Sequence, residues 1–343
     1  MRILYGVCGD GFGHSSRALI VADYLKKKGH DVKIITYGRA YKVLKDKFDV
    51  FKVSGLQMIF VRGVLKKRKT MKYNLENFPK NLKKWKRFHK LMNEFKPDLC
   101  ISDMDPIVPM LRNWYNLPLI SFDNQHRITN LKFDVPKKYY KDYLLAKNVV
   151  NAFVRKADYF VIVSFTQIKN IKKNTFVVPP IIRENIKKIK PKFDGKILVY
   201  LTRKNSSVLR ILKTIDENFV VYGYNIKKKD KNLEFKKRET FLKDLSKCKA
   251  IIATSGFTLM AESLYLKKPY FALPLKGQFE QTLNALFLKK SGFGDYAEDI
   301  TKKDVDNFLD NLDNYRKKLK RYAPNYNKLF DVLDRILLNL RKF

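Results

Sequence analysis

A histidine that follows a glycine-rich turn and an aspartate that ends an apolar run are residue types that can take part in proton transfer. His14 closes the glycine-rich stretch GVCGDGFGH of residues 6–14, and Asp103 closes the apolar run in PDLCISDMDP of residues 97–106. A neutral imidazole accepts a proton near pH 7, and a carboxylate behind it fixes the tautomer and stabilises the imidazolium. Two other interpretations stay open: His14 could be a turn residue bonded to backbone, and Asp103 could cap a helix.

A second polar cluster, in ATSGFTLMAE of residues 253–262, could bind a diphosphate. A strand-like run leads into Ser255 and Gly256, and a helix is expected to begin just after them. The first N–H groups of a helix lack partners and carry partial positive charge, which favours bound phosphate. Glu262, six residues after Gly256, could accept two hydrogen bonds from a ribose diol.

Further along the chain, an acid and an amide stand side by side in PLKGQFEQTLNA of residues 274–285. Glu280 and Gln281 follow the end of a strand and are expected in a loop, where they would suit sugar hydroxyls. Taken singly, Gly256 could be only a turn, and Glu262 only an acid favoured by the helix dipole. The order and spacing of these residues together indicate a nucleotide-sugar site.

The N-terminal half offers further candidates near the expected strand ends. The glycines of residues 9–13 alone would suit a dinucleotide fingerprint, but no acidic residue closes the second expected strand at residues 32–36. The loop FDNQHRI of residues 122–128 follows another strand end, so Asn124 and His126 are acceptor-side candidates. His126 is also a rival to His14 as the base.

Apolar runs of strand length alternate with helical periodicity along the chain, which predicts an α/β fold with parallel sheets. The strands are expected at residues 3–7, 32–36, 99–102, 119–122, 159–163, 197–201, 219–222, 250–254 and 269–274. The stretch 179–195 contains Pro179, Pro180 and Pro191 and is typical of a linker. We therefore predict a first domain over residues 1–178, a second over 196–324, and an amphipathic C-terminal helix over 325–343 that could pack back on the first domain.

Residues 254–288, TSGFTLMAESLYLKKPYFALPLKGQFEQTLNALFL, resemble the donor-binding signature of UDP-sugar glycosyltransferases of the GT-B fold. They are similar both to plant-type UDP-glycosyltransferases and to the peptidoglycan UDP-N-acetylglucosamine transferase. The resemblance implies two Rossmann-like domains with parallel sheets that face a cleft, the acceptor bound by the first domain and the nucleotide-sugar by the second. It also implies an inverting, metal-independent transfer of a sugar from a UDP-sugar to an acceptor hydroxyl, with no further cofactor.

The same resemblance assigns a role to each matching residue. His14 would be the general base and Asp103 the carboxylate that orients it, with Gly11, Gly13, Asn124 and His126 on the acceptor side. The implied donor-binding residues are Arg183, Thr254, Ser255, Gly256, Thr258, Glu262, Glu280 and Gln281. Thr254 departs from the plant-type pattern, which has a histidine there, and LTRKNSS of residues 201–207 replaces the glycine-rich loop of the bacterial enzyme. The segment DMD of residues 103–105, an Asp-x-Asp pattern, lies outside the expected nucleotide-binding half, so no metal site is expected.

The charge of the chain points to anionic partners. Its 72 Lys and Arg against 33 Asp and Glu give a formal net charge of +39, which would attract lipid headgroups, nucleotides or nucleic acid. A general lysine bias explains the spread-out lysines equally well. Residues 62–90 are denser, with twelve basic residues against one acid, and aromatic residues interleave them. This segment could dock on an anionic membrane, which would suit a lipid-linked acceptor, or could be a solvated helix face; nucleic acid is the less favoured partner.

Two alternative functions remain at this stage: a UDP-sugar 2-epimerase of the same fold, and a polyanion-binding protein that has lost catalysis. Cys8, Cys100 and Cys248 lie far apart without metal-ligand spacing, and no apolar run reaches the ~20 residues of a membrane helix. These features predict a reduced, cytoplasmic protein, which could sit peripherally at the inner face of the membrane.

Overall fold

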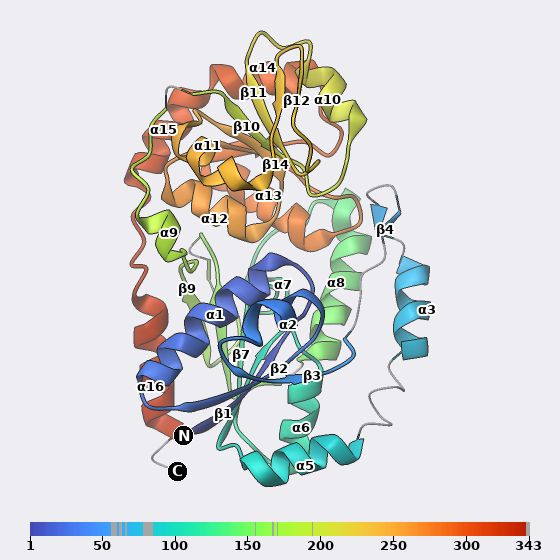
Figure 1. Ribbon diagram of the computed structural model, residues 1–343, viewed down its shortest axis with the longest axis vertical. Coiled ribbons are helices and arrows are strands. Elements are labelled where there is room, and N and C mark those ends of the chain that lie inside the picture. The colour runs from blue at the N-terminus through green and yellow to red at the C-terminus, as the bar shows by residue number, and fades with distance from the viewer. Residues whose placement is uncertain are drawn as a thin grey trace. The chain divides into compact units, whose positions relative to one another are not determined.

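The protein forms two compact units (Figure 1). Unit 1 comprises residues 1–59, 66–181 and 325–343, and unit 2 comprises residues 60–65 and 182–324. The computed structural model describes residues 1–55, 60–61, 64–65, 67–77, 85–154, 156–166, 168–169, 171–193 and 195–340.

Unit 1 is built on a seven-stranded sheet with the order β3-β2-β1-β6-β7-β8-β9, in which all neighbouring strands are parallel. The strand order reverses between β1 and β6, and in open α/β sheets ligands bind beyond the carboxyl ends of the strands at such a point. The strands are β1 (Arg2–Val7), β2 (Asp31–Thr36), β3 (Asp49–Lys52), β6 (Leu99–Asp103), β7 (Leu119–Asp123), β8 (Tyr159–Val163) and β9 (Thr175–Val178).

Helices join these strands, as parallel neighbours require a crossover connection. They are α1 (Phe12–Lys27), α2 (Gly38–Leu44), α3 (Lys67–Asn77), α5 (Trp85–Phe95), α6 (Ile107–Tyr115), α7 (Arg127–Asn130), the 3₁₀ turn η1 (Lys137–Tyr139), α8 (Tyr140–Phe153) and, from the C-terminal end of the chain, α16 (Lys328–Leu340). Helix α16 buries an apolar stripe in unit 1. Its Asp334 accepts hydrogen bonds from Tyr24 (2.8 Å) and Lys28 (2.8 Å) of α1, beside which it lies in Figure 1.

Unit 2 repeats this plan with the strand order β12-β13-β11-β10-β14-β15-β16, in which only the β12–β13 pair is antiparallel. Here the order reverses between β10 and β14. The strands are β10 (Ile197–Tyr200), β11 (Phe219–Tyr222), β12 (Lys228–Asp230), β13 (Leu233–Phe235), β14 (Ile251–Thr254), β15 (Tyr270–Leu273) and β16 (Gly294–Tyr296). The short strands β4 (Phe60–Val61) and β5 (Val64–Leu65) form a separate antiparallel pair.

Unit 2 has a hydrophobic core in which Phe271 of β15 and Phe308 meet edge to face at 5.3 Å, and helical segments accompany its sheet. They are α9 (Glu184–Lys187), α10 (Ser206–Leu212), the 3₁₀ turn η2 (Arg238–Thr240), α11 (Phe241–Lys247), α12 (Phe257–Tyr265), α13 (Phe279–Ser291), α14 (Lys302–Asp310) and α15 (Leu312–Arg321). Lys268 is fully buried, and its ammonium donates to the backbone carbonyls of Lys192, Ser246 and Cys248. These carbonyls replace the water that a buried charge loses, so Lys268 anchors the segment around Lys192 to unit 2.

The α/β class with two parallel-stranded halves, predicted from the sequence, is confirmed. One local expectation is wrong: Glu280 and Gln281 lie in the first turn of α13, which begins at Phe279, and not in a loop. The expected linker 179–195 contains helix α9, and the boundary between the units falls between residues 181 and 182.

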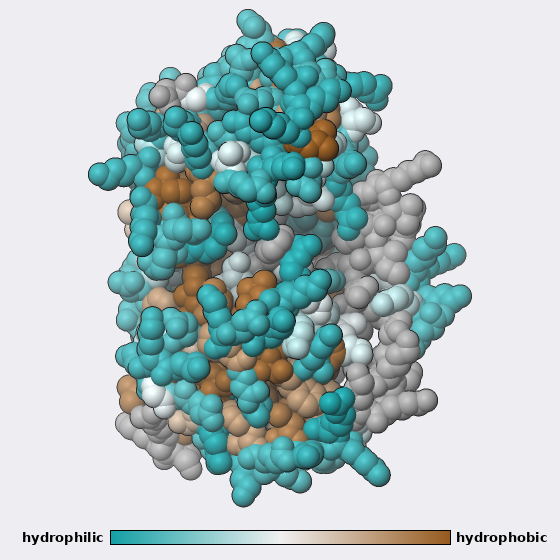
Figure 2. All heavy atoms as spheres, viewed as in Figure 1, coloured by the Kyte–Doolittle hydropathy of each residue, from teal (hydrophilic) through white to brown (hydrophobic). Residues whose placement is uncertain are grey.

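The surface of the protein reflects its lysine-rich composition, and Figure 2 shows hydrophilic residues over most of the visible face. Of the basic segment 62–90, residues 62, 63, 66 and 78–84 lie outside the described residues. No helix in the described part of the chain combines the length and apolar character needed to cross a membrane. Cys8, Cys100 and Cys248 are buried free thiols.

Candidate active site

The first polar cluster lies at the carboxyl ends of β1 and β6, where the strand order of unit 1 reverses. Helix α1 begins directly after Gly11, whose positive φ of 78° suits glycine and whose Cβ position faces open space. The first turn of α1 therefore carries Gly13 and His14 above the end of β1. Asp103 is the last residue of β6 and pairs in register with Val7 of β1. The Nδ1 atom of His14 lies 2.7 Å from Oδ1 of Asp103, so the structure brings the two expected residues together.

Arg17, on the next turn of α1, completes this cluster, and the sequence analysis missed it. Its Nε donates to Oδ2 of Asp103 (2.9 Å) and its Nη2 to Oδ1 (2.5 Å), a two-point ion pair. Its Nη1 donates to Oδ1 of Asn124, just after β7 (3.2 Å). Residues three apart on a helix share a face, so the spacing of His14 and Arg17 in GHSSR was the signal that could have revealed it.

His126 is built into the interior of the fold. It is 1% exposed, its Nδ1 lies 2.6 Å from Oδ2 of Asp123, and its Nε2 lies 3.0 Å from the carbonyl oxygen of Val154. Both ring nitrogens are therefore engaged with oxygen atoms of the fold. Burial opposes the charge of Asp123, but the charge and hydrogen bonds of His126 outweigh it and lower the pKa of Asp123 to about 2. With neither ring nitrogen free, His126 does not compete with His14 as a base.

Asp105 is a buried carboxylate outside the His14 cluster. Its Oδ2 accepts from the backbone N–H of Val108 (2.7 Å), at the start of α6, and its Oδ1 has no partner in the described part of the chain. Burial raises the pKa of Asp105 to about 7, although backbone hydrogen bonds oppose the shift. Asp103 is committed to His14 and Arg17, and no group of three or more metal-ligating side chains is gathered among the described residues.

The second polar cluster lies in unit 2 at the carboxyl end of β14. Helix α12 begins at Phe257, so the N–H groups of its first turn, with Thr258 at the second position, lack intrahelical partners. A Cβ at Gly256 would meet nothing within 4 Å. The buried hydroxyls of Thr254 and Ser255 have no hydrogen-bond partner within the described residues. Open space, free backbone donors and unused hydroxyls together form a cradle suited to an anion.

Arg183 holds the carboxylate of Glu262, which lies further along helix α12. Glu262 is 1% exposed, and Arg183 donates to both its oxygens, from Nε to Oε1 at 2.5 Å and from Nη2 to Oε2 at 2.7 Å. The hydrogen bond and charge of Glu262 raise the pKa of Arg183, while burial opposes the shift. Each carboxylate oxygen retains a second acceptor site, so Glu262 is fixed in place and can still bind a diol.

Gln281 and Glu280, the amide and the acid at the start of α13, have different surroundings. Gln281 is mostly buried, and its Oε1 accepts from the backbone N–H of Leu275 (3.1 Å), which fixes the loop before the helix. Glu280 is partly exposed on the first turn. Asn284, one turn further, donates to the carbonyl oxygen of Ser255 (2.8 Å) and so ties α13 to the cradle.

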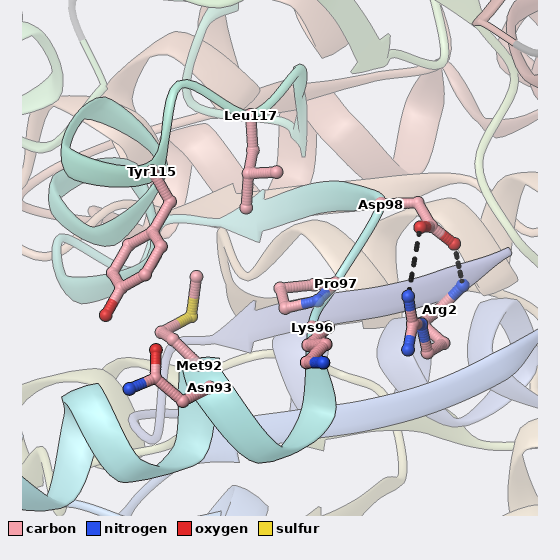
Figure 3. Close-up of a pocket in the computed structure, with 8 residues that line it drawn as sticks. All are labelled: Arg2, Met92, Asn93, Lys96, Pro97, Asp98, Tyr115 and Leu117. Carbon is pink, nitrogen blue, oxygen red and sulfur yellow. Dashed lines mark hydrogen bonds and ion pairs between the residues drawn. The ribbon is translucent and has the colours of Figure 1, made fainter.

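A cavity of about 400 Å³ lies at the opposite end of the unit 1 sheet. Figure 3 shows Arg2, at the start of β1, paired with Asp98, just before β6, with Met92 and Tyr115 on another wall. It is therefore at the amino ends of the strands, whereas His14 and Asp103 lie at the carboxyl ends, where this type of sheet binds ligands.

Comparison with known proteins agrees with this architecture. The structure of a kitacinnamycin glycotransferase superimposes with a TM-score of 0.68 at 13% identity, covering 97% of this chain and 98% of that one. MurG of Acinetobacter baumannii gives a TM-score of 0.63 at 16% identity, covering 98% and 99%. The glycosyltransferase VinC, solved in complex with dTDP, gives 0.65 at 13% identity and covers both chains fully. The fold is therefore that of the GT-B glycosyltransferases.

The sequence comparisons define the family. The model of glycosyl transferase family 1 matches residues 1–313. An uncharacterized glycosyltransferase of Methanosarcina mazei is 22% identical over 333 residues, which cover 86% of this chain and 85% of the relative. The chain belongs to glycosyl transferase family 1, and it is an enzyme that transfers a sugar.

The buried carboxyl of Asp105 generates a pH prediction. Its pKa is about 7 in the folded chain against 3.8 for the free side chain, so between pH 4 and pH 7 the folded state binds more protons than the unfolded state. The free energy of unfolding therefore falls as pH rises through this window. The variant Asp105→Asn lacks the titrating carboxyl group, so this fall in its free energy of unfolding should be absent. Its stability relative to wild type should rise between pH 4 and pH 8 by up to about 4 kcal/mol, since each pKa unit is worth about 1.4 kcal/mol.

Denaturant unfolding at several pH values measures this difference. The exposed Asn93 of α5 provides the control, because Asn93→Ala changes no titratable group and should keep a nearly constant difference from wild type. A constant difference for Asp105→Asn as well would contradict the prediction.

Proposed function

We propose that the enzyme transfers a sugar from a UDP-sugar to an acceptor hydroxyl, with inversion at the anomeric carbon and without a metal ion. The observation that carries this proposal is the His14–Asp103 pair at the carboxyl end of the unit 1 sheet. Because the ionised Asp103 only accepts, the Nδ1 atom of His14 carries the proton. Its Nε2 has no partner among the described residues and can accept a proton from a substrate.

In the proposed reaction, Nε2 of His14 takes the proton of the acceptor hydroxyl as its oxygen attacks the anomeric carbon. The bond from that carbon to the diphosphate oxygen breaks, and the nucleoside diphosphate leaves with the electron pair. Asp103 stabilises the imidazolium that forms. Attack from the face opposite the leaving group inverts the anomeric centre. Asn124, held by Arg17, and the bare backbone of Gly11 and Gly13 would border the acceptor.

The cradle of unit 2 would bind the donor. The first turn of α12 and the hydroxyls of Thr254, Ser255 and Thr258 would bind the diphosphate, and the helix dipole would stabilise its charge as it leaves. Glu262 would accept from the ribose diol. Glu280, and the amide nitrogen of Gln281, would contact the sugar hydroxyls. The VinC complex with dTDP supports a pyrimidine nucleotide, and the resemblance of residues 254–288 to UDP-dependent enzymes favours UDP.

Arg183 has a specific place in this scheme. Its guanidinium donates two hydrogen bonds to the carboxylate of Glu262. It would therefore orient the ribose-binding carboxylate, and its own charge would act on the diphosphate at longer range.

We further propose that the protein works in the cytoplasm and docks on the anionic inner face of a membrane to reach a lipid-linked acceptor. Support comes from α3, which exposes Met71 (61%) and Leu75 (65%) one turn apart among basic residues. Trp114, at the end of α6, is 55% exposed and packs against Trp85 of α5. Exposed apolar side chains beside lysines are what an interfacial helix uses on anionic lipid.

Calorimetric titration tests the donor site. We expect wild type to bind UDP and Glu262→Gln to bind it at least tenfold more weakly, because the neutral amide accepts less strongly from the ribose and loses half of its pairing with Arg183. Asp310→Ala, which removes an exposed carboxylate of α14, should bind UDP like wild type. Equal affinity of Glu262→Gln and wild type would remove Glu262 from the site, and no UDP binding by wild type would refute the proposed donor.

Vesicle flotation at low salt tests the membrane proposal. Wild type should float with phosphatidylglycerol vesicles and not with phosphatidylcholine vesicles. The double variant Met71→Ser, Leu75→Ser should float several-fold less. Ile171→Ser, which removes an apolar side chain that is similarly exposed elsewhere on unit 1, serves as the control and should float like wild type. Wild type that fails to float with either lipid would contradict the membrane-docking proposal.

A further inference from the structure

We propose that Arg17 is a positioning residue that keeps His14 neutral, with its proton on Nδ1 and its Nε2 lone pair free. The inference deepens the proposed function and rests on it only for the role of the free Nε2. It concerns a side chain that neither the sequence motif nor the family match singles out.

The contacts of Arg17 hold the Asp103 carboxylate in a single orientation. Both oxygens of Asp103 receive an N–H from the same planar guanidinium, and a two-point pair of this kind fixes the plane of the carboxylate. Oδ1 then faces Nδ1 of His14 at 2.7 Å. The guanidinium is itself fixed, because Nη1 is bonded to Asn124 after β7. Arg17 thus joins α1, β6 and the end of β7 around the His14 ring.

Arg17 also determines the charge state of the carboxylate. Asp103 is fully buried, and without Arg17 its carboxylate would need another cation, the imidazolium of His14, to stay ionised. Burial opposes the charge of Arg17, but Asp103, together with Tyr5 and Asp123 at longer range, keeps the pKa of Arg17 above its usual value. The pair is therefore an arginine cation with a carboxylate anion. Such a carboxylate can only accept, which puts the ring proton of His14 on Nδ1.

The same cation limits how strongly His14 holds a second proton. The Nη2 atom of Arg17 lies 3.2 Å from Nδ1 of His14, so an imidazolium at this position would face both the anion of Asp103 and a second cation. In a histidine–aspartate pair without an arginine, the unbalanced carboxylate would favour the imidazolium. Here the guanidinium of Arg17 offsets the charge of the carboxylate beside the ring.

Nitrogen-15 NMR of the histidine rings tests this directly, because the chain has four histidines and ring nitrogen shifts report both tautomer and protonation. In wild type near pH 7, His14 should be the Nδ1–H tautomer. In Arg17→Gln, which removes the cation and keeps part of the side chain, the pH midpoint of His14 should rise by about one unit or more. Arg17→Lys, which keeps the charge without the fork, should lie in between.

Arg87→Gln provides the matched control, because it removes an exposed arginine of α5 in the same unit and should leave His14 unchanged. The signals of His30 and His89 report whether each variant is folded. A His14 midpoint that does not move in a folded Arg17→Gln variant would overturn the proposal. So would an Nε2–H tautomer in wild type, a measurement that holds even if Arg17→Gln fails to fold.

The NMR test of Arg17 and the UDP-binding test of the proposed function can fail independently of each other. Failure of wild type to bind UDP would refute the donor assignment and leave the His14 tautomer as measured. If UDP binds but His14 carries its proton on Nε2, the glycosyltransferase assignment stands and the role of Arg17 falls.

Discussion

The burial of the Asp103 carboxylate is the constraint on which the arrangement of polar side chains in unit 1 depends. A carboxylate removed from water is stable only while charged or hydrogen-bonding partners replace the lost solvation. Arg17 and His14, both from α1, supply those partners. Satisfying Asp103 therefore also fixes the helix that follows the glycine-rich turn, and this places the histidine ring at the reversal point of the sheet.

Unit 2 contains the same kind of contact between a buried carboxylate and an arginine. Glu262 is also buried, and Arg183 also meets both of its oxygens. In each unit a carboxylate near the carboxyl end of the sheet is held rigid by an arginine fork. Within the described residues, the hydroxyls of Thr254 and Ser255 have no hydrogen-bond partner, and no partner is seen for Nε2 of His14. Rigid acceptors beside unused polar groups are what positioning and charge stabilisation in a transfer reaction require.

Much of the fold could be predicted from the sequence, because parallel strands buried on both faces appear as short apolar runs. The expected run 159–163 coincides with β8, and 219–222 with β11. The His14–Asp103 pairing is implied by the resemblance to plant-type UDP-glycosyltransferases, because Asp103 ends one strand-like run and His14 follows the glycine-rich turn after another. Arg183 is among the implied donor-binding residues, but its pairing with Glu262, 79 residues away along the chain, could not be predicted. Arg17 was missed, although its spacing of three residues from His14 places both side chains on one helix face. Glu280 was misplaced because the segment before it, rich in glycine and polar residues, resembles a loop up to Gln278, which caps α13 without a side-chain hydrogen bond.

Release of UDP from UDP-sugars in the presence of a panel of hydroxyl acceptors is the measurement that tests the central claim most directly. The account predicts that wild type releases UDP with at least one donor and acceptor pair. His14→Ala should then be slower by about 10²-fold or more, because it lacks the general base, while its affinity for UDP stays unchanged. Equal rates for the two proteins, or no release by wild type with any pair, would contradict the account.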